Sequence, residues 1–227
     1  MKDIFYGKSF KDTVGYKIEI NNKRDTHHHF LGGSNWELPE CPLCKHSMHQ
    51  LISLDLKDER LSKFHGNQRE DLPLFSCLNC SMQWDEQFFK IDFISKSASI
   101  IQQKQEKEEQ LDEEVRIAVP IPILPITLKE FKKKDYPTSE ESYDDIFSDL
   151  GVEYLGRVLG KPVLAQDELN KKCCNCHEDM SFIALITGEI FMEDLEEKNI
   201  DLFFGELILY FSFCTKCEII KVESQSI

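Results

Sequence analysis

The sequence lacks any long hydrophobic run and any leader-like beginning. No apolar stretch approaches the roughly 18 residues that a membrane helix needs. The opening residues, Met1 to Phe5, are not followed by the apolar segment of a secretion signal. We therefore expect a cytoplasmic protein that makes no use of a membrane and whose thiols stay reduced.

Basic residues are scarce relative to acidic ones. There are 27 Lys and Arg against 41 Asp and Glu, and the formal net charge is −14. Residues 1–101 carry 13 basic and 14 acidic side chains, whereas residues 102–227 carry 14 and 27. Such a field repels nucleic-acid phosphates and attracts basic partners, although acidic surfaces also serve simply to keep proteins soluble.

Enzyme motifs are missing as well. The sequence has no phosphate-cradling glycine loop, no His-Glu-x-x-His zinc motif and no Gly-x-Ser-x-Gly elbow. The run His27-His28-His29 cannot turn three adjacent side chains toward one ion, so we expect a polar segment leading into a loop. Trp36 and Trp84 are predicted to be core or rim residues. These features predict a protein without catalytic activity.

What the sequence does contain is nine cysteines, eight of them in pairs separated by two residues. That gap lets both sulfurs of a pair reach one ion from a tight turn, and two pairs complete a tetrahedral shell. We predict two zinc sites, the first from Cys41, Cys44, Cys77 and Cys80, the second from Cys173, Cys176, Cys214 and Cys217. Four thiolates leave no open coordination position, so both sites would be structural.

Three alternatives stay open for the cysteines. The pairs could be dithiol redox centres, which use the same spacing but normally occur once in a chain. The second site could consist of buried cysteines without metal. Cys174, the ninth cysteine, could replace Cys173 as a ligand.

Hydrophobic patterns predict the main elements. The stretch 57–71 is a loop or short helix, and Ser139 caps an acidic helix that ends near Leu150 at Gly151. Gln102 to Glu114 is a solvated helix or connector, and Pro120 to Ile126 is neither helix nor central strand but an extended, packed segment. The predicted strands are Tyr16–Ile20, Leu51–Leu56, Leu72–Cys77, Phe88–Ile94, Phe182–Ile186 and Leu207–Phe213.

The second half reads as a distorted copy of the first. Met180 falls four residues after Cys176, as Met48 falls four after Cys44, and Leu159-Gly160 stands where Leu31-Gly32 stands. We predict a β-rich α+β fold of two pseudo-repeats, each built around a four-cysteine, zinc-ribbon-like site. The units would span 1–101 and 138–227, packed together and joined by a charged connector and Pro-rich crossover at 102–137.

The motif order resembles a known superfamily. Leu31-Gly32-Gly33, Trp36, Cys41-Pro42-Leu43-Cys44 and Met48, followed by Leu74 to Cys80, is similar to the YwqG-like bacterial proteins and their eukaryotic relatives around programmed cell death protein two. In that superfamily a Leu-Gly-Gly-x-Pro-x-Trp element precedes the first thiol pair, and the unit is duplicated in a β-rich α+β fold. Here Ser34 stands in place of the proline, and Gly160 lacks a second glycine.

The resemblance implies protein handling rather than catalysis. Eukaryotic members are similar to dedicated chaperones for a basic ribosomal protein, and bacterial members have been proposed as toxin-neutralising immunity proteins. We therefore expect a zinc-stabilised protein that masks a basic protein partner, either a toxin or a nascent client. The alternatives are a thiol redox enzyme and a zinc-ribbon nucleic-acid binder, the latter disfavoured by charge.

Overall fold

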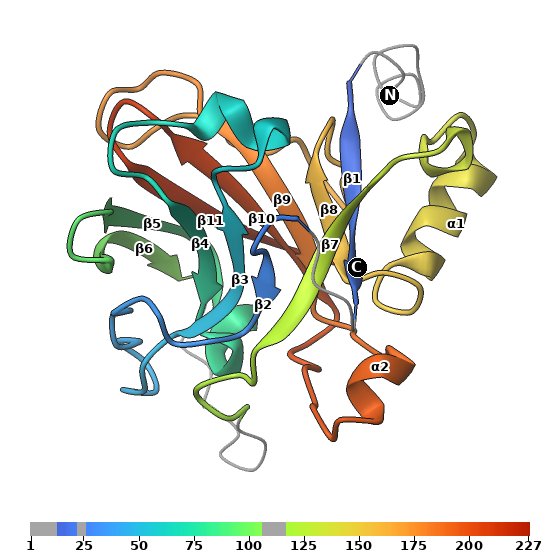
Figure 1. The fold of residues 1–227 in the computed structure, drawn as a ribbon, viewed down its shortest axis with the longest axis horizontal. Coiled ribbons are helices and arrows are strands. Elements are labelled where there is room, and N and C mark those ends of the chain that lie inside the picture. Colours follow the sequence, from blue (N-terminus) through green and yellow to red (C-terminus); the bar gives the residue numbers. More distant parts are fainter. Residues whose placement is uncertain (1–12, 22–25, 106–116) are drawn as a thin grey trace.

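A computed structural model describes residues 13–21, 26–105 and 117–227 of the chain. Its eleven strands form one curled sheet in the order β4-β3-β2-β7-β1-β8-β9-β10-β11-β5-β6 (Figure 1). Every pairing between neighbouring strands is antiparallel. The fold is therefore β-rich, as predicted. Among the described residues, no helix is long and apolar enough to cross a membrane.

Strands supply most of the regular structure, and helices are short. The strands are β1 (Gly15–Ile20), β2 (Phe30–Leu31), β3 (His49–Asp55), β4 (Asp71–Ser76), β5 (Trp84–Asp92), β6 (Ser97–Gln105), β7 (Leu124–Glu130), β8 (Gly156–Leu159), β9 (Ser181–Thr187), β10 (Leu207–Cys214) and β11 (Ile219–Ser226). The α-helices are α1 (Glu140–Asp149) and α2 (Glu193–Glu196), and the 3-10 helices are η3 (Glu59–Phe64), η4 (Leu78–Gln83) and η5 (Lys133–Asp135).

Most of the predicted elements are confirmed. The six predicted strands correspond to β1, β3, β4, β5, β9 and β10, and the predicted loop or short helix at 57–71 contains η3. The Ser139 side chain accepts a hydrogen bond from the Ser142 N–H and caps α1. Gly151 follows the helix with a φ of +85°, a conformation that costs glycine little. The expected helix start and end are therefore both present.

The prediction for the proline-rich segment was wrong from Leu124 onward, because β7 begins there and lies between β2 and β1 inside the sheet, whereas residues 120–123 belong to no helix or strand. Pro125 is tolerated there because its carbonyl alone is used toward β1, accepting from the Asn21 N–H at 3.1 Å. Asn21 lies just beyond the end of β1, and toward β2 the neighbouring Ile126 N–H supplies the backbone bond, to the His29 carbonyl at 3.2 Å. The missing proline N–H therefore removes little from the ladder. Ile121 is buried, as expected of a packed segment.

The polar stretch from Gln102 was also misread at its start. Residues up to Gln105 belong to β6, which pairs with β5 at the edge of the sheet. Its side chains are mostly exposed, so the composition looks like that of a connector although the backbone is paired. The rest of the predicted connector, 106–114, lies outside the described residues.

The two halves of the chain share one pairing register. His49 faces Ser76 between β3 and β4, and Ser181 faces Phe213 at the same position between β9 and β10. Both ladders shift by one residue after their second pair, between Gln50 and Ile52 in one and at the corresponding place in the other. The units β4-β3-β2-β7 and β10-β9-β8-β1 therefore have matching strand orders and meet at the β1–β7 pair.

This register corrects the sequence comparison at one place. Leu31 faces Ile52, and Val158 faces Ala184, which is the residue equivalent to Ile52. Gly32 therefore corresponds to Leu159 rather than to Gly160. Both have positive φ angles, 74° and 59°. The comparison was displaced by one residue because a leucine adopts the left-handed conformation that usually marks glycine.

Strands from the two halves are also interleaved. β5 and β6 come from the first half but extend the sheet beyond β11 of the second, and β1 pairs with β8. One continuous sheet thus crosses the predicted boundaries at residues 101 and 137. The division into two related units stays a prediction.

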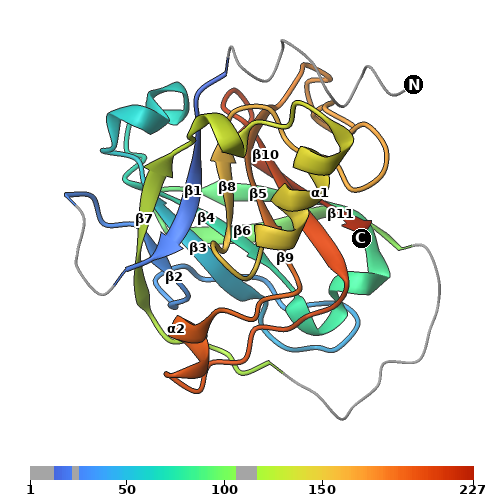
Figure 2. The same cartoon turned by 90° about the vertical axis from the view of Figure 1, so that its right-hand side faces the viewer.

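Curling of the sheet creates two main apolar layers. The inner one is a large cluster in which the rings of Phe75 and Phe89 are tilted against each other with centroids 4.7 Å apart, and Trp36 meets Phe93 edge-on at 5.7 Å. Both tryptophans are core residues, 5% exposed. The outer layer lies beneath α1, whose Tyr143 and Ile146 belong to the same apolar cluster as residues of β9 and β10 (Figure 2).

Candidate metal centres

The first cysteine pair lies in a tight hairpin before β3. The Cys41 N–H donates to the His46 carbonyl at 2.8 Å, and the Lys45 N–H donates back to the Cys41 carbonyl at 2.9 Å. Lys45 closes the turn with a φ of 62°. This hairpin brings Cys41 and Cys44 to one side of the loop.

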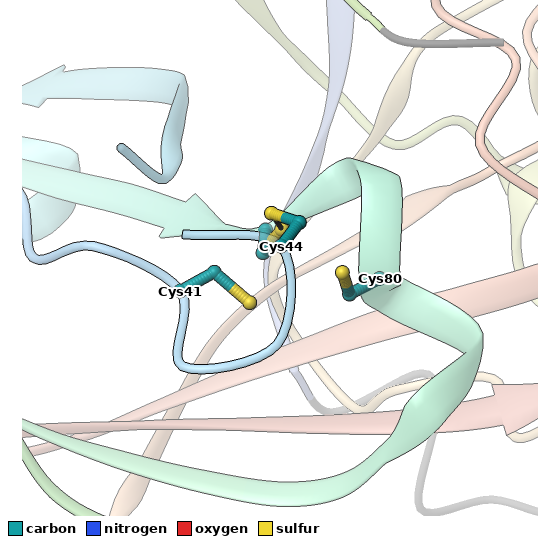
Figure 3. Close-up of side chains that lie close together, drawn as sticks. Cys41, Cys44 and Cys80 are labelled. Atoms are coloured by element: carbon teal, nitrogen blue, oxygen red, sulfur yellow. Dashed lines mark hydrogen bonds between the residues drawn. The ribbon is translucent and has the colours of Figure 1, made fainter. Parts of the chain in front are cut away.

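The second pair comes from the end of β4. Cys77 directly follows that strand, and Cys80 lies in η4 with its N–H donating to the Cys77 carbonyl at 3.1 Å. Figure 3 shows Cys41 and Cys44 on the hairpin facing Cys80 on the short helix. Because β3 pairs with β4, the hairpin before one strand and the turn after the other meet at the same end of the sheet.

The other cluster repeats this arrangement. The Cys173 N–H donates to the Glu178 carbonyl at 3.0 Å, and the His177 N–H returns to the Cys173 carbonyl at 3.0 Å. His177 has a φ of 59°. Cys214 ends β10, as Cys77 follows β4. The same local hydrogen bonds and strand ends therefore position both sets of cysteines.

All eight predicted cysteines are brought together as predicted, in two groups of four whose sulfurs lie within 4.8 Å of one another. The Cys44 and Cys77 sulfurs are 3.5 Å apart, and those of Cys176 and Cys214 are 3.7 Å apart. These separations exceed a disulfide bond of about 2.05 Å, and the cysteines are free. A tetrahedral ion with Zn–S bonds of about 2.3 Å places its sulfurs about 3.8 Å apart.

Ionisation of the first cluster is uneven without a cation. Hydrogen bonds from the Cys77 and Cys80 thiols lower the pKa of Cys41 to about 2. The same contact with Cys41, together with burial, raises the pKa of Cys77, and it raises that of Cys80 to about 12. One thiolate is therefore stabilised at the expense of its neighbours, and four thiolates together need a cation.

The second cluster is less enclosed. Cys173 and Cys214 are buried, whereas Cys176 and Cys217 are half-buried. Burial raises the pKa of Cys214 to about 12. The half-buried Cys174 lies outside the group of four, so the geometry brings Cys173, not Cys174, together with the other three sulfurs.

The histidine run contains a buried structural contact that the sequence did not indicate. The His29 Nε2 lies 2.8 Å from the Asp58 carboxylate, and its Nδ1 accepts from the Asp55 N–H at 3.0 Å. Arg60 binds the same carboxylate. The contact fixes the start of η3 against β3. Because His29 and Asp58 are far apart in sequence, no local pattern predicts this contact.

Comparisons with known proteins do not assign this chain to a family. No protein-family model, curated protein or solved structure matches the chain. The resemblance to the YwqG-like superfamily therefore stays a prediction based on short motifs, and function has to be argued from the site and the surface.

Proposed function

We propose that each cysteine group binds one structural zinc ion. The observation that carries this proposal is the grouping of eight sulfurs into two compact sets at equivalent positions. All-thiolate tetrahedral shells suit zinc, and they leave no position for substrate. Binding energies of about 10–16 kcal/mol for such sites are comparable to or larger than a typical domain stability of about 5–15 kcal/mol, so the ions would hold the fold.

The two units are proposed to have arisen by duplication. Support comes from the shared register, the shared bulge position and the matching hairpins around Cys41 and Cys173. Each zinc ion would then fix the same corner in both units, where a hairpin before one central strand meets the end of its neighbour.

The protein is further proposed to work in the cytoplasm as a non-enzymatic binder that masks a basic protein, as an immunity protein or a chaperone-like factor. The acidic second half supports this role, because an unbalanced negative field speeds encounter with a basic surface. The dithiol redox alternative is less well supported, since the sulfurs lie in closed groups of four rather than in isolated pairs. The net charge of −14 argues against the nucleic-acid alternative.

Association measurements test the binding role. The chain would be immobilised with its metal retained, and bound host proteins would be identified at low and at high salt. The proposal predicts a basic protein whose association rate falls steeply as salt rises, because screening weakens interactions between exposed charges. Capture dominated by nucleic acid, or by an acidic protein with no salt dependence, would contradict it.

A further inference from the structure

The connection between β9 and β10, residues 188–206, differs from the rest of the surface, and we refer to it as the β9–β10 segment. It contains α2 and stands outside the sheet in both views (Figures 1 and 2). Five of its apolar side chains are buried against the main core: Ile190, Met192, Leu195, Leu202 and Phe204. The segment is therefore anchored rather than loosely attached.

The base of the segment is tightly packed. The Gly188 N–H donates to the Leu207 carbonyl at 2.7 Å, and the Phe191 N–H donates to the Gly151 carbonyl at 2.8 Å. A Cβ at Gly188 would lie 2.3 Å from the Gly205 carbonyl oxygen, so the two arms of the segment approach closely. Whatever this segment presents is held in place before binding, which lowers the entropic cost of association.

What it presents is a pair of phenylalanines. Phe191 and Phe203 are 53% and 41% exposed, and their rings lie tilted beside each other with centroids 6.0 Å apart. Among the described residues they are the only aromatic side chains in the exposed large hydrophobic set. Exposed aromatic pairs that are held rigidly are typical of protein-binding surfaces.

Beside Phe191 lies a hollow of about 380 Å³. Its lining includes the buried Ile190, Met192 and Leu195, and also the exposed acidic residues Glu196 and Asp201, which we call its acidic rim. Such a hollow can accept one aliphatic or aromatic side chain.

Charge on the segment is strongly negative. Its single cation, Lys198, donates to the Asp194 carbonyl at 3.2 Å. Seven carboxylates oppose it, those of Glu189, Glu193, Asp194, Glu196, Glu197, Asp201 and Glu206. An apolar centre with an acidic rim selects a ligand of the opposite pattern.

The equivalent connection in the first half, residues 56–70, has neither feature. It carries four basic and three acidic side chains. No large hydrophobic side chain of residues 56–70 is exposed. The two connections occupy equivalent positions in the two units, so the aromatic pair and the acidic rim are specific to the second half.

We propose that the β9–β10 segment is the docking surface for a basic segment of a protein partner. The partner would insert an apolar side chain against Phe191 and Phe203, and flanking Lys or Arg side chains would reach the rim carboxylates. This inference rests on the proposed binding of a basic protein and assigns that binding to one surface.

The test measures fluorescence anisotropy with the full, metal-loaded chain and a defined probe. The probe is a labelled peptide in which lysines alternate with leucine and phenylalanine, and its control replaces every apolar residue with alanine. The native chain should bind the apolar peptide at least ten-fold more tightly than the alanine peptide. The double variant Phe191→Ala/Phe203→Ala should lose at least ten-fold in affinity for the apolar peptide.

Matched control variants distinguish binding at this surface from nonspecific apolar contact and from nonspecific attraction by charge. Ile94→Ala/Ile123→Ala removes two apolar side chains elsewhere that are more exposed than the phenylalanines and should change affinity less than two-fold. Glu196→Gln/Glu197→Gln should weaken binding and reduce its salt dependence more than Asp144→Asn/Asp145→Asn, which removes the same charge from α1. Unchanged zinc content and melting temperature would show that each variant is folded.

The outcomes distinguish the site from the function. Equal binding of the apolar peptide by the native chain and the phenylalanine variant would overturn the docking surface while leaving binding of basic partners intact. Failure of the native chain to bind either peptide at low salt would contradict the proposed function itself.

Discussion

Lys45 and His177 occupy equivalent positions in the two cysteine hairpins, and both have left-handed backbone conformations, with φ angles of 62° and 59°. Each donates its N–H to the carbonyl of the first cysteine of its pair. Both side chains are exposed, so the constraint at these positions comes from the backbone. Because two chemically different residues adopt the same strained conformation, we infer that the turn is needed to position the cysteines.

Substitution at this turn should follow backbone preference rather than side-chain chemistry. Lys45→Val should be less stable than Lys45→Gly by about 1–2 kcal/mol, because a β-branched residue is disfavoured in the left-handed region. His177→Val and His177→Gly should differ in the same sense. Urea unfolding with metal bound measures the difference. Both substitutions at one position are uncharged, so equal stability would contradict the account of the turn.

Neighbouring cysteines should differ sharply in importance. Cys173→Ser should lower the zinc content from two ions per chain to one and destabilise the second half, because it removes a buried ligand. Cys174→Ser should retain both ions, since this sulfur lies outside the group of four. Metal analysis of the two variants side by side checks the assignment. Loss of an ion from Cys174→Ser would instead identify Cys174 as the ligand.

Glycine at position 151 should be indispensable. Its φ is +85°, and a Cβ there would lie 1.9 Å from the Glu189 carbonyl oxygen. Gly151→Ala should therefore cost about 2 kcal/mol or more, from left-handed strain and a backbone clash. Gly66→Ala is the comparison variant and should cost less, because a Cβ at that position meets side-chain atoms of Arg69 rather than backbone, and no positive φ is involved. Similar melting temperatures for the two variants would contradict this interpretation.

The buried His29 should contribute to acid sensitivity. Burial lowers the pKa of His29 below its ordinary value of 6.5, although the Asp58 carboxylate opposes the shift. The unfolded chain therefore takes up a proton near pH 6.5 before the folded chain does. The stability gained from a neutral His29 is present above pH 6.5 and is lost as the pH falls below it, by at most about 1.4 kcal/mol per pH unit.

His29→Gln tests this linkage. The variant should be less stable at pH 7, and its stability should change less between pH 7 and pH 5 than that of the native chain. Titration of Asp58 does not contribute in this pH range. Burial raises its pKa, but hydrogen bonds from Arg60 and His29 outweigh that effect and lower the pKa to about 2. Parallel pH profiles for the two proteins would rule out His29 as the source.

The sequence predicted what depends on local spacing. The Cys-x-x-Cys pairs, the Ser139 cap and the alternation in Leu207–Phe213 each reflect interactions within a few residues, and all are present. The sequence did not predict which strands pair with one another. Nothing near Phe89 indicates that β5 pairs with β11 rather than with β4, because that choice depends on how the whole sheet curls.

Errors arose where tertiary contacts outweigh local preference. Pro125 was excluded from a central strand on its missing N–H, but it lies opposite Asn21, just beyond the end of β1, where its carbonyl still accepts a hydrogen bond. Leu159 adopts a conformation expected of glycine, which displaced the comparison of the two halves. Phe191 and Phe203 drew no prediction from the sequence, and only their exposure distinguishes them.

The zinc and thiol content of gently purified native protein tests the central claim most directly. Mass spectrometry of the metal and titration of reactive thiols would be made on one sample before and after chelation. The account predicts two zinc ions per chain, blocking of the eight clustered thiols and unfolding when the metal is removed. A metal-free chain that remains folded with its thiols open to reagent would contradict it.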